Sequence, residues 1–262
     1  MEKNIDSIKY SSNYLSSVIC RVDFAKPLSE SVITQLAAGT EISTDFPIRG
    51  KDQVATAALI NVSKSSPDAE PVVSEEKSQI VMKQFHDLTG KNKCVLSPQN
   101  LVFEYSSYDS FESLQVHFMR VVEKIIGSGE NTIVSRFGLR YINTFNSDNV
   151  RIQKGFFSDF VSAFVNLRST DDIPLSRAMG HMEYLQDDIR LTFNYGKFNR
   201  NYPGILQKND FVLDYDAVIQ GTYDIADLFP SKLVSAHKMI QTTFENCITD
   251  KLRATMNGEK NE

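Results

Sequence analysis

The side chains best suited to bind a charged molecule lie in the stretch "SRFGLRYIN" (135–143). Side chains alternate between the two faces of a strand, so Arg136, Gly138 and Arg140 fall on one face and aromatic and aliphatic residues on the other. Guanidinium groups bind phosphates and carboxylates, which makes this face a candidate anion site. Gly138 between the arginines indicates close backbone approach, a β-bulge, or room for the two guanidinium groups.

A second stretch, "FVLDYD" (211–216), places Asp214 and Asp216 on one face of another predicted strand. Two carboxylates on one face are able to hold a divalent metal ion. Together with nearby arginines they would resemble a triphosphate-processing tunnel, but the chain lacks an E-x-E-x-K strand near its start, and "CRVDF" (20–24) is the closest stretch. If the arginine and aspartate strands are neighbours, Arg–Asp pairs form across them, each contributing roughly 0.2–1 kcal/mol.

Five predicted strands divide in this way into an apolar and a charged face. The charged faces add Arg21 beside Asp23, Glu104 and Arg190 to the residues above. Two interpretations stay open: an ion-paired outer surface, or a concave groove that binds a charged ligand or partner.

The sequence carries few other signs of chemistry. Its four histidines lack H-x-x-x-H and H-E-x-x-H spacing, and no P-loop, G-x-S-x-G or G-x-G-x-x-G motif occurs. We therefore expect no catalytic constellation, metal or cofactor. His117 is predicted to be exposed beside the apolar stripe of its helix, and His237 to be a hydrogen-bonded histidine at the edge of the core.

The overall charge is acidic, with 28 basic and 33 acidic residues and a pI near 5.5. Such a chain is not a general DNA-coating protein, because that binding depends on clustered positive charge. Basic residues nevertheless cluster in the middle third of the chain and keep RNA or DNA binding as an alternative: Arg136, Arg140, Arg151, Lys154, Arg190, Lys197 and Arg200.

The cysteines and the hydropathy indicate a cytoplasmic protein. Cys20, Cys94 and Cys247 lie far apart, so no zinc knuckle or dithiol motif is predicted, and reduced thiols are expected. The N-terminus lacks the apolar stretch of a signal peptide, and no apolar run approaches the roughly 20 residues that cross a bilayer.

The periodicity predicts the same order of elements in each half of the chain. Residues 1–128 contain a strand at 17–24, a helix at 28–39, three strands within 79–108 and a helix at 109–127 with a capping box of Asp109 and Glu112. We interpret residues 40–78 as an exposed loop, because they are polar and rich in Pro and Ser.

Residues 129–262 repeat this order. A strand at 132–143 precedes a helix at 155–167, a hairpin that turns at 186–188, a strand at 210–219 and one long helix at 230–256. Both halves therefore have the order β-α-β-β-β-α. This predicts an α+β fold, mainly an antiparallel sheet with helices packed on one face, built from two fused halves.

Four stretches together resemble a sporadically distributed prokaryotic family of similar length with a central G-L-R-Y-I-N strand. They are "NYLSSVICRVDF" (13–24), "SRFGLRYIN", "FVLDYD" and "AHKMIQTTFENCIT" (236–249). The resemblance covers nearly the whole chain, least of all residues 40–78, and supplies no reaction. The sporadic distribution implies carriage on mobile or defence-associated loci, and hence an accessory role.

The leading hypothesis is a non-enzymatic binding or interaction module of a prokaryotic accessory system, such as antiviral defence. Its charged face would contact a partner protein or an anionic ligand, and a homo-oligomer is compatible with it. The alternatives are a metal-dependent phosphate- or nucleotide-processing enzyme that uses Asp214 and Asp216, and an RNA- or DNA-binding protein. No membrane association is expected.

Overall fold

An antiparallel β-sheet is the main element of the computed structural model, which describes residues 10–63, 72–130, 132–146, 150, 152–167, 173, 175–206 and 210–258. Its strands are β1 (Leu15–Phe24), β2 (Ile48–Arg49), β3 (Gln53–Ser63), β4 (Val72–His86), β5 (Asn92–Leu96), β6 (Asn100–Tyr105), β7 (Ile133–Phe145), β8 (Ala178–Gln186), β9 (Ile189–Lys197) and β10 (Phe211–Asp224). The order across the sheet is β2-β4-β5-β6-β1-β7-β10-β9-β8, and β3 pairs with β4 outside this path. Every described pair is antiparallel, which confirms the predicted sheet.

The two halves of the chain meet at the centre of this sheet, where β1 pairs with β7. Outward from β1 the order is β6, β5, β4, and outward from β7 it is β10, β9, β8. In each half the first strand is therefore central and is followed outward by the last strand of the same half. The two halves of the sheet share this arrangement of strands, and the duplication itself stays a prediction. The predicted boundary at residues 128 and 129 falls between α3 and β7.

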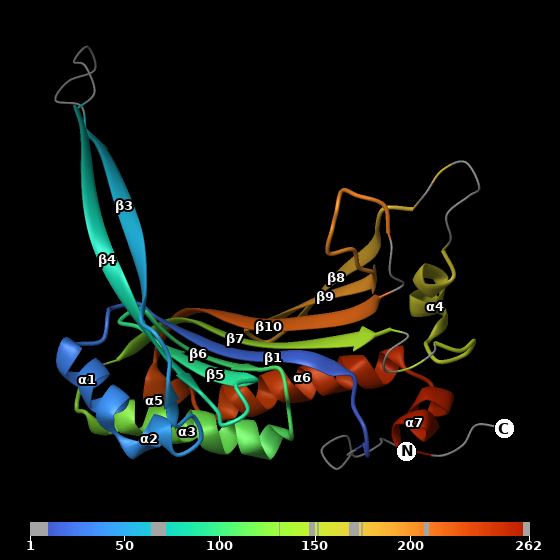
Figure 1. The fold of residues 1–262 in the computed structure, drawn as a ribbon, viewed down its shortest axis with the longest axis horizontal. Coiled ribbons are helices and arrows are strands. Elements are labelled where there is room, and N and C mark those ends of the chain that lie inside the picture. The colour runs from blue at the N-terminus through green and yellow to red at the C-terminus, as the bar shows by residue number, and fades with distance from the viewer. Residues whose placement is uncertain are drawn as a thin grey trace.

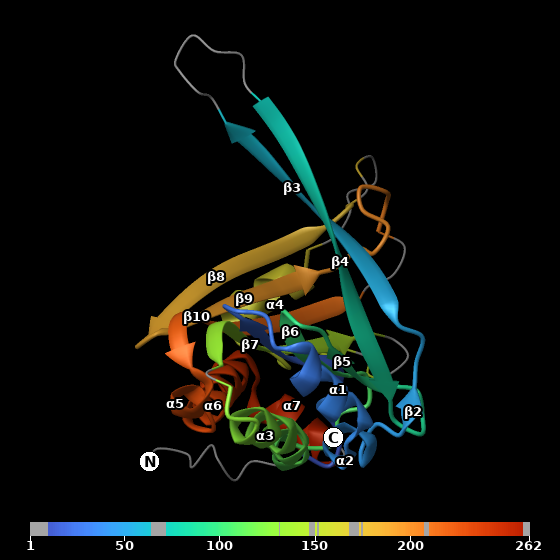
Figure 2. The ribbon, with the colours of Figure 1, turned by 90° about the vertical axis from the view of Figure 1, so that its left-hand side faces the viewer.

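Helices cover one face of the sheet, as the sequence predicts (Figure 1, Figure 2). They are α1 (Glu30–Ala38), α2 (Thr40–Ser43), α3 (Phe111–Gly127), α4 (Asp159–Val165), α5 (Ile225–Leu228), α6 (Ser231–Cys247) and α7 (Asp250–Met256). α3 and α6 are the long helices of this layer. The short helix α4 packs at the far end, where Phe160 and Phe164 contact the ring of Tyr195 on β9.

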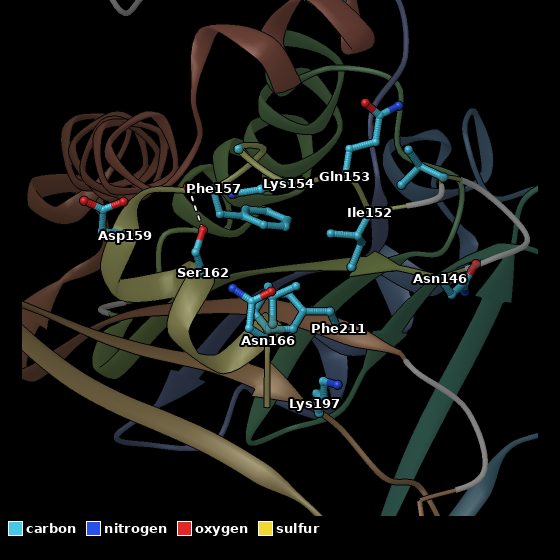
Figure 3. Close-up of a pocket in the computed structure, with 13 residues that line it drawn as sticks. Asn146, Ile152, Gln153, Lys154, Phe157, Asp159, Ser162, Asn166, Lys197 and Phe211 are labelled. Carbon is cyan, nitrogen blue, oxygen red and sulfur yellow. Dashed lines mark hydrogen bonds between the residues drawn. The ribbon is translucent and has the colours of Figure 1, made fainter. Parts of the chain in front are cut away.

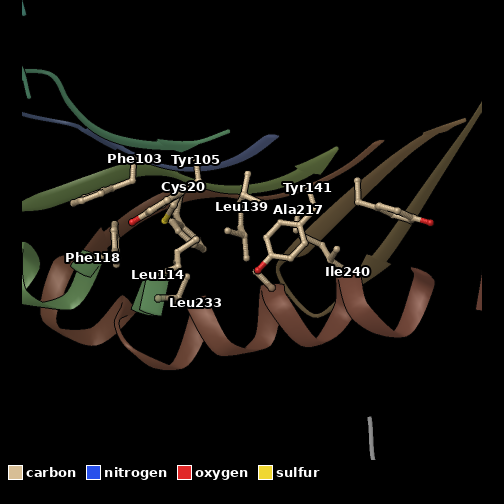
Figure 4. Close-up of a cluster of buried hydrophobic side chains, with 14 of the residues drawn as sticks. Cys20, Phe103, Tyr105, Leu114, Phe118, Leu139, Tyr141, Ala217, Leu233 and Ile240 are labelled. Atoms are coloured by element: carbon tan, nitrogen blue, oxygen red, sulfur yellow. The ribbon is translucent and has the colours of Figure 1, made fainter. Parts of the chain in front are cut away.

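Side-chain alternation sends one face of each central strand into the core. On β7, Phe137, Leu139 and Tyr141 are buried and point toward the helices, while Arg140 between them points away. Figure 4 shows Leu139 and Tyr141 above α6, next to Leu233 and Ile240. Each helix that packs on this face needs an apolar stripe to cover the buried side chains of the sheet. Both α3 and α6 have such a stripe.

The three cysteines belong to this core. Cys20 on β1, Cys94 on β5 and Cys247 at the end of α6 are buried free thiols. Burial raises the pKa of all three and brings that of Cys247 to about 11. They act as small apolar side chains.

The exposed loop predicted for residues 40–78 is wrong for the part that the structure describes. This segment forms α2, β2, β3 and the first half of β4, and only residues 64–71 lie outside the described ranges. β3 and β4 form a hairpin that rises from the sheet on the side away from the helices (Figure 1). Val54 of β3 and Val81 of β4, which pair with each other, are both exposed, so burial imposes no alternation of apolar and polar residues there.

The single C-terminal helix predicted for residues 230–256 is also wrong, because it breaks after Cys247. Ile248 is extended and forms an antiparallel bridge with Phe157. The N–H of Ser158 donates to Cys247 O at 2.9 Å, and that of Thr249 donates to Phe156 O at 3.0 Å. This bridge replaces the helical hydrogen bonds, and α7 starts anew at Asp250. The same constraint limits the helix predicted at 155–167 to α4.

The structure differs from the sequence prediction at the start of α3 and at the start of β7. The cap of α3 is Ser110, whose hydroxyl accepts from the N–H of Ser113, and not Asp109. At the start of β7 a β-bulge shifts the register, so that Val134 is buried and Ser135 is exposed. The regular alternation of buried residues along β7 therefore begins at Phe137.

His117 on α3 is half-buried, which corrects the prediction that it is exposed. Its Nδ1 shares a hydrogen bond with the Tyr105 hydroxyl at 3.2 Å, and its Nε2 lies 3.4 Å from an oxygen of Asp45. Asp45 also pairs with Arg120. This network joins the end of the α2 segment to α3. Burial, partly offset by the attraction to Asp45, lowers the pKa of His117.

Among the described helices none is long and apolar enough to cross a membrane.

Replacing Phe118 with Ala is expected to lower the free energy of unfolding by about 3–5 kcal/mol. Its fully buried ring contacts Phe103 and Phe229 edge-on, so truncation leaves a cavity between the helices and the sheet. Urea unfolding followed by circular dichroism measures the change. Val116→Ala on the exposed side of the same helix is the control and should stay within about 0.5 kcal/mol of the wild type.

Lowering the pH from 7.5 to 5 is expected to destabilise the wild type more than the His117→Gln variant. Because the folded pKa of His117 lies below its ordinary value of 6.5, the unfolded chain takes up a proton that the folded chain resists. The stability from the neutral imidazole is therefore present above about pH 6.5 and is lost as the pH falls. Urea midpoints at several pH values test this, and parallel profiles of the two proteins would contradict it.

Candidate functional site

The structure gathers most of the predicted charged residues on the outer face of the three central strands. Arg21 and Asp23 lie on β1, Arg136 and Arg140 on β7, and Asp214 and Asp216 on β10. The register places Arg21, Gly138 and Val218 side by side, and the next outward-facing row is Ile19, Arg140 and Asp216. The expectation that the arginine and aspartate strands are neighbours is confirmed.

The strongest ion pair on this face is diagonal. Nε and Nη2 of Arg140 donate to the two carboxylate oxygens of Asp214 at 2.8 and 2.7 Å. The directly opposite residue, Asp216, has no ion pair among the described residues. Asp214 is nearly buried, whereas 40% of the Arg140 side chain is exposed. The buried carboxylate therefore fixes the guanidinium, and part of the arginine side chain remains accessible to solvent.

Arg136 is held more weakly, and its guanidinium lies over Gly138. Its Nη1 is 3.5 Å from a carboxylate oxygen of Asp23, which Arg21 contacts at 2.7 Å. A Cβ on Gly138 would lie 3.0 Å from Nη2 of Arg136. The glycine therefore provides room for one guanidinium. The bulge that its sequence position suggested occurs instead between Val134 and Arg136.

Asp216 is a partly buried carboxylate on this face. Burial raises its pKa, and Arg136, Arg140 and Arg190 oppose this shift at longer range, while the negative charge of Asp214 adds to it. The carboxylate of Asp216 thus bears a desolvation cost that no direct ion pair offsets. Groups of this kind are more common at binding sites than on ordinary surfaces.

Two hollows open above these residues. One has a volume of about 400 Å³ and is bordered by Arg21, Arg136, Arg140 and Asp216. The other has about 510 Å³, extends toward β8 and the connection between β9 and β10, and shares Arg140 with the first. In Figure 1 the β3–β4 hairpin rises at one end of this face and the connection between β9 and β10 at the other.

Two predicted residues lie outside the hollows. Glu104 is on the outer face of β6, where it pairs with Lys93 of β5 at 2.8 Å. Arg190 on β9 donates to the side chain of Gln220 at 3.3 Å. Both side chains are therefore engaged by a residue on an adjacent strand and do not contribute to the hollows.

Sequence patterns missed two residues of the second hollow. Arg177, which stacks over the ring of Tyr202 at 4.3 Å, and Asp210 both line it, next to Arg200. Arg177 and Asp210 directly precede strands, so no alternation marks the direction of their side chains. Only the fold brings them to this face.

The aspartate pair is not arranged for a metal ion. Both oxygens of Asp214 accept from Arg140, so a cation would have to displace that guanidinium. The described residues contain no group of three His, Cys, Asp or Glu side chains able to hold a metal ion.

A larger hollow of about 680 Å³ lies elsewhere, between α4, β9 and β10 (Figure 3). Two of its polar side chains bond to nearby backbone carbonyls. The ammonium of Lys197 donates to Leu167 O at 2.6 Å, and the Ser162 hydroxyl donates to Phe157 O at 2.9 Å. The outer face therefore remains the better candidate for a charged ligand.

Comparison with known protein families and with curated proteins finds no match to this chain. The family resemblance of the "GLRYIN" stretch stays a prediction, and the site is interpreted from its geometry.

The two aspartates of β10 are expected to respond differently to neutralisation. Asp214→Asn breaks the bidentate pair and should cost about 1–2 kcal/mol of stability, reduced from a buried pair because Arg140 is partly exposed. Asp216→Asn removes an unpaired carboxylate and should stay within about 0.5 kcal/mol or stabilise the protein. Urea unfolding at pH 7 compares them, and an equal loss in both variants would contradict the assignment.

The pH dependence of the same variants gives a second measurement. Because the folded pKa of Asp216 is raised above 3.8, the folded chain holds a proton that the unfolded chain releases. This contribution to stability is present at low pH and is lost as the pH rises through the raised pKa. The difference in stability between wild type and Asp216→Asn should change over that interval.

Proposed function

We propose that the protein is a non-enzymatic binding module whose outer sheet face receives an anionic group, carried by a small ligand or by a partner protein. One observation carries the proposal: five arginines and four aspartates line the two joined hollows, in a chain whose net charge is −5. These residues are Arg21, Arg136, Arg140, Arg177 and Arg200, with Asp23, Asp210, Asp214 and Asp216. The face is thus positive within an acidic protein.

The arrangement of the arginines favours binding. Asp214 fixes Arg140 from below and leaves its outer edge toward the hollow, so little side-chain entropy is lost on binding. Arg136 makes one long contact with Asp23 and can turn from Gly138 toward a ligand. A phosphate or carboxylate between these two guanidinium groups would accept hydrogen bonds from both.

The same lining argues against a catalytic role. Among its described residues neither hollow contains a His or Cys, and the bidentate contact occupies Asp214. A metal-dependent phosphate- or nucleotide-processing reaction would need Asp214 to release Arg140 first. The four interleaved aspartates also weigh against nucleic acid, because they would repel a continuous phosphate backbone.

A role within a prokaryotic accessory system, such as antiviral defence, is compatible with this binding function. It rests on the family resemblance drawn from the sequence.

Titration calorimetry with inorganic pyrophosphate and tripolyphosphate tests the proposal. Arg136→Glu is expected to weaken binding at least about tenfold, because it removes one positive group and adds a repulsive one. Lys93→Glu makes the same change of charge on the same face, outside the hollows, and should alter affinity less than about twofold.

Two outcomes would contradict the assignment: no polyphosphate or polycarboxylate binding by the wild type, or equal binding by the two variants. Salt-sensitive binding of single- or double-stranded oligonucleotides that disappears in Arg136→Glu would favour the nucleic-acid alternative instead.

A further inference from the structure

A separate cavity of about 220 Å³ lies on the opposite side of the sheet, beneath β7 and β10. Tyr141 and Tyr215 form its roof, and the start of α3 and the middle of α6 form its walls. These two tyrosines are paired across the strands and alternate with Arg140, Asp214 and Asp216 of the outer face. Nothing in the proposed outer-face function uses this cavity.

Two polar groups at this cavity have no oxygen or nitrogen hydrogen-bond partner in the part of the chain that the structure describes. Asn143 lines it with 5% of its surface exposed, and its side-chain amide makes no hydrogen bond within the described residues. The hydroxyl of Tyr215 is fully buried and has no oxygen or nitrogen partner among the described residues; the weakly polar thiol of Cys247 is its nearest polar neighbour. Buried polar groups are normally satisfied, so two of them at one cavity indicate a polar ligand.

The remaining walls combine aromatic rings with carboxylates. The hydroxyl of Tyr141 shares hydrogen bonds with Tyr108 at 2.9 Å and with His237 at 3.0 Å, which bears out the prediction of a hydrogen-bonded histidine at the core edge. Phe111 stacks on His237 with ring centres 3.8 Å apart. Rings of this kind attract a cation through their faces.

The charges of the cavity favour a cation. Asp109, Glu112 and Glu245 line it, and none of its described lining residues is Lys or Arg. Glu245 is buried and fixed by Tyr10 at 2.6 Å and by Arg253 at 2.8 Å. Asp109 and Glu112 stand at the start of α3, and their negative charges would repel an anion that enters the cavity.

The volume sets the size of the ligand. It corresponds to about seven water molecules at roughly 30 Å³ each, which suits a small molecule and not a peptide or nucleotide. A primary ammonium group donates up to three hydrogen bonds, and the Asn143 carbonyl oxygen and the Tyr215 hydroxyl oxygen are both acceptors.

We propose that this cavity binds a small organic ammonium ion. The ammonium group donates to Asn143 and Tyr215, and the apolar body of the ligand lies against the tyrosine and phenylalanine rings.

Three probes with the same phenyl body test the proposal: 2-phenylethylammonium, 2-phenylethanol and 3-phenylpropionate. Methyl-labelled methionines report the place of binding by NMR, because Met256 lines this cavity and Met179 lines the outer hollow. The ammonium ion is expected to shift the Met256 signal in a saturable way and to leave Met179 unchanged. The alcohol should bind about tenfold more weakly, and the carboxylate more weakly still.

Variants of the two unpartnered groups complete the test. Tyr215→Phe is expected to weaken binding about fivefold, because one acceptor is lost, and Asn143→Leu about tenfold or more, because it also fills the cavity. Tyr14→Phe, a buried tyrosine that does not line the cavity, should leave affinity unchanged. If Asn143→Leu does not fold, the comparison of the two tyrosine variants still decides.

The proposal fails if the ammonium ion gives no saturable shift of Met256, if the alcohol or carboxylate binds as tightly, or if Tyr215→Phe and Tyr14→Phe bind alike. Arg136→Glu should not affect this binding, so the result is independent of the outer face.

Discussion

The register of β7 between β1 and β10 is the constraint on which the rest of the structure depends. β7 sends Phe137, Leu139 and Tyr141 into the core and Arg136 and Arg140 to the outer face. A slip of one residue would exchange these two sets and put guanidinium groups under the helices. The fully buried aromatic and aliphatic side chains fix the register, and the charged face is positioned as a consequence.

The outer face is charged but only partly ion-paired. Its aspartates do not simply neutralise its arginines: Asp214 holds Arg140 with two short contacts, whereas Asp216, directly opposite Arg140, remains without an ion pair. Because Arg140 pairs with Asp214, its guanidinium is fixed. The carboxylate of Asp216 is left partly buried, and burial raises its pKa. The five arginines and four aspartates that line the two hollows leave one positive formal charge in excess.

Alternation along the strands allowed the two-faced sheet, the pairing of the "GLRYIN" and "LDYD" strands and the helix stripes to be predicted. It failed where long-range contacts override local pattern. Val54 and Val81 of the projecting β3–β4 hairpin are exposed, so burial imposes no pattern there, and the break after Cys247 depends on Phe157, far away in sequence. The diagonal choice of Arg140 and the approach of Arg177 likewise depend on side-chain geometry. The cavity that holds Asn143 is assembled from β7, β10, α3 and α6, so no local spacing reveals it.

The three buried cysteines make the cooperativity of this fold measurable without any substitution. Cys20 and Cys94 lie in the sheet of the first half, and Cys247 ends a helix of the second half, all nearly or fully shielded from solvent. A thiol reagent reaches each of them only when its surroundings open, so its rate of labelling reports the free energy of that opening. Equal opening energies at all three sites would mean that the two halves unfold as one unit. Earlier labelling at Cys247 would mean that the helix layer of the second half separates from the shared sheet first.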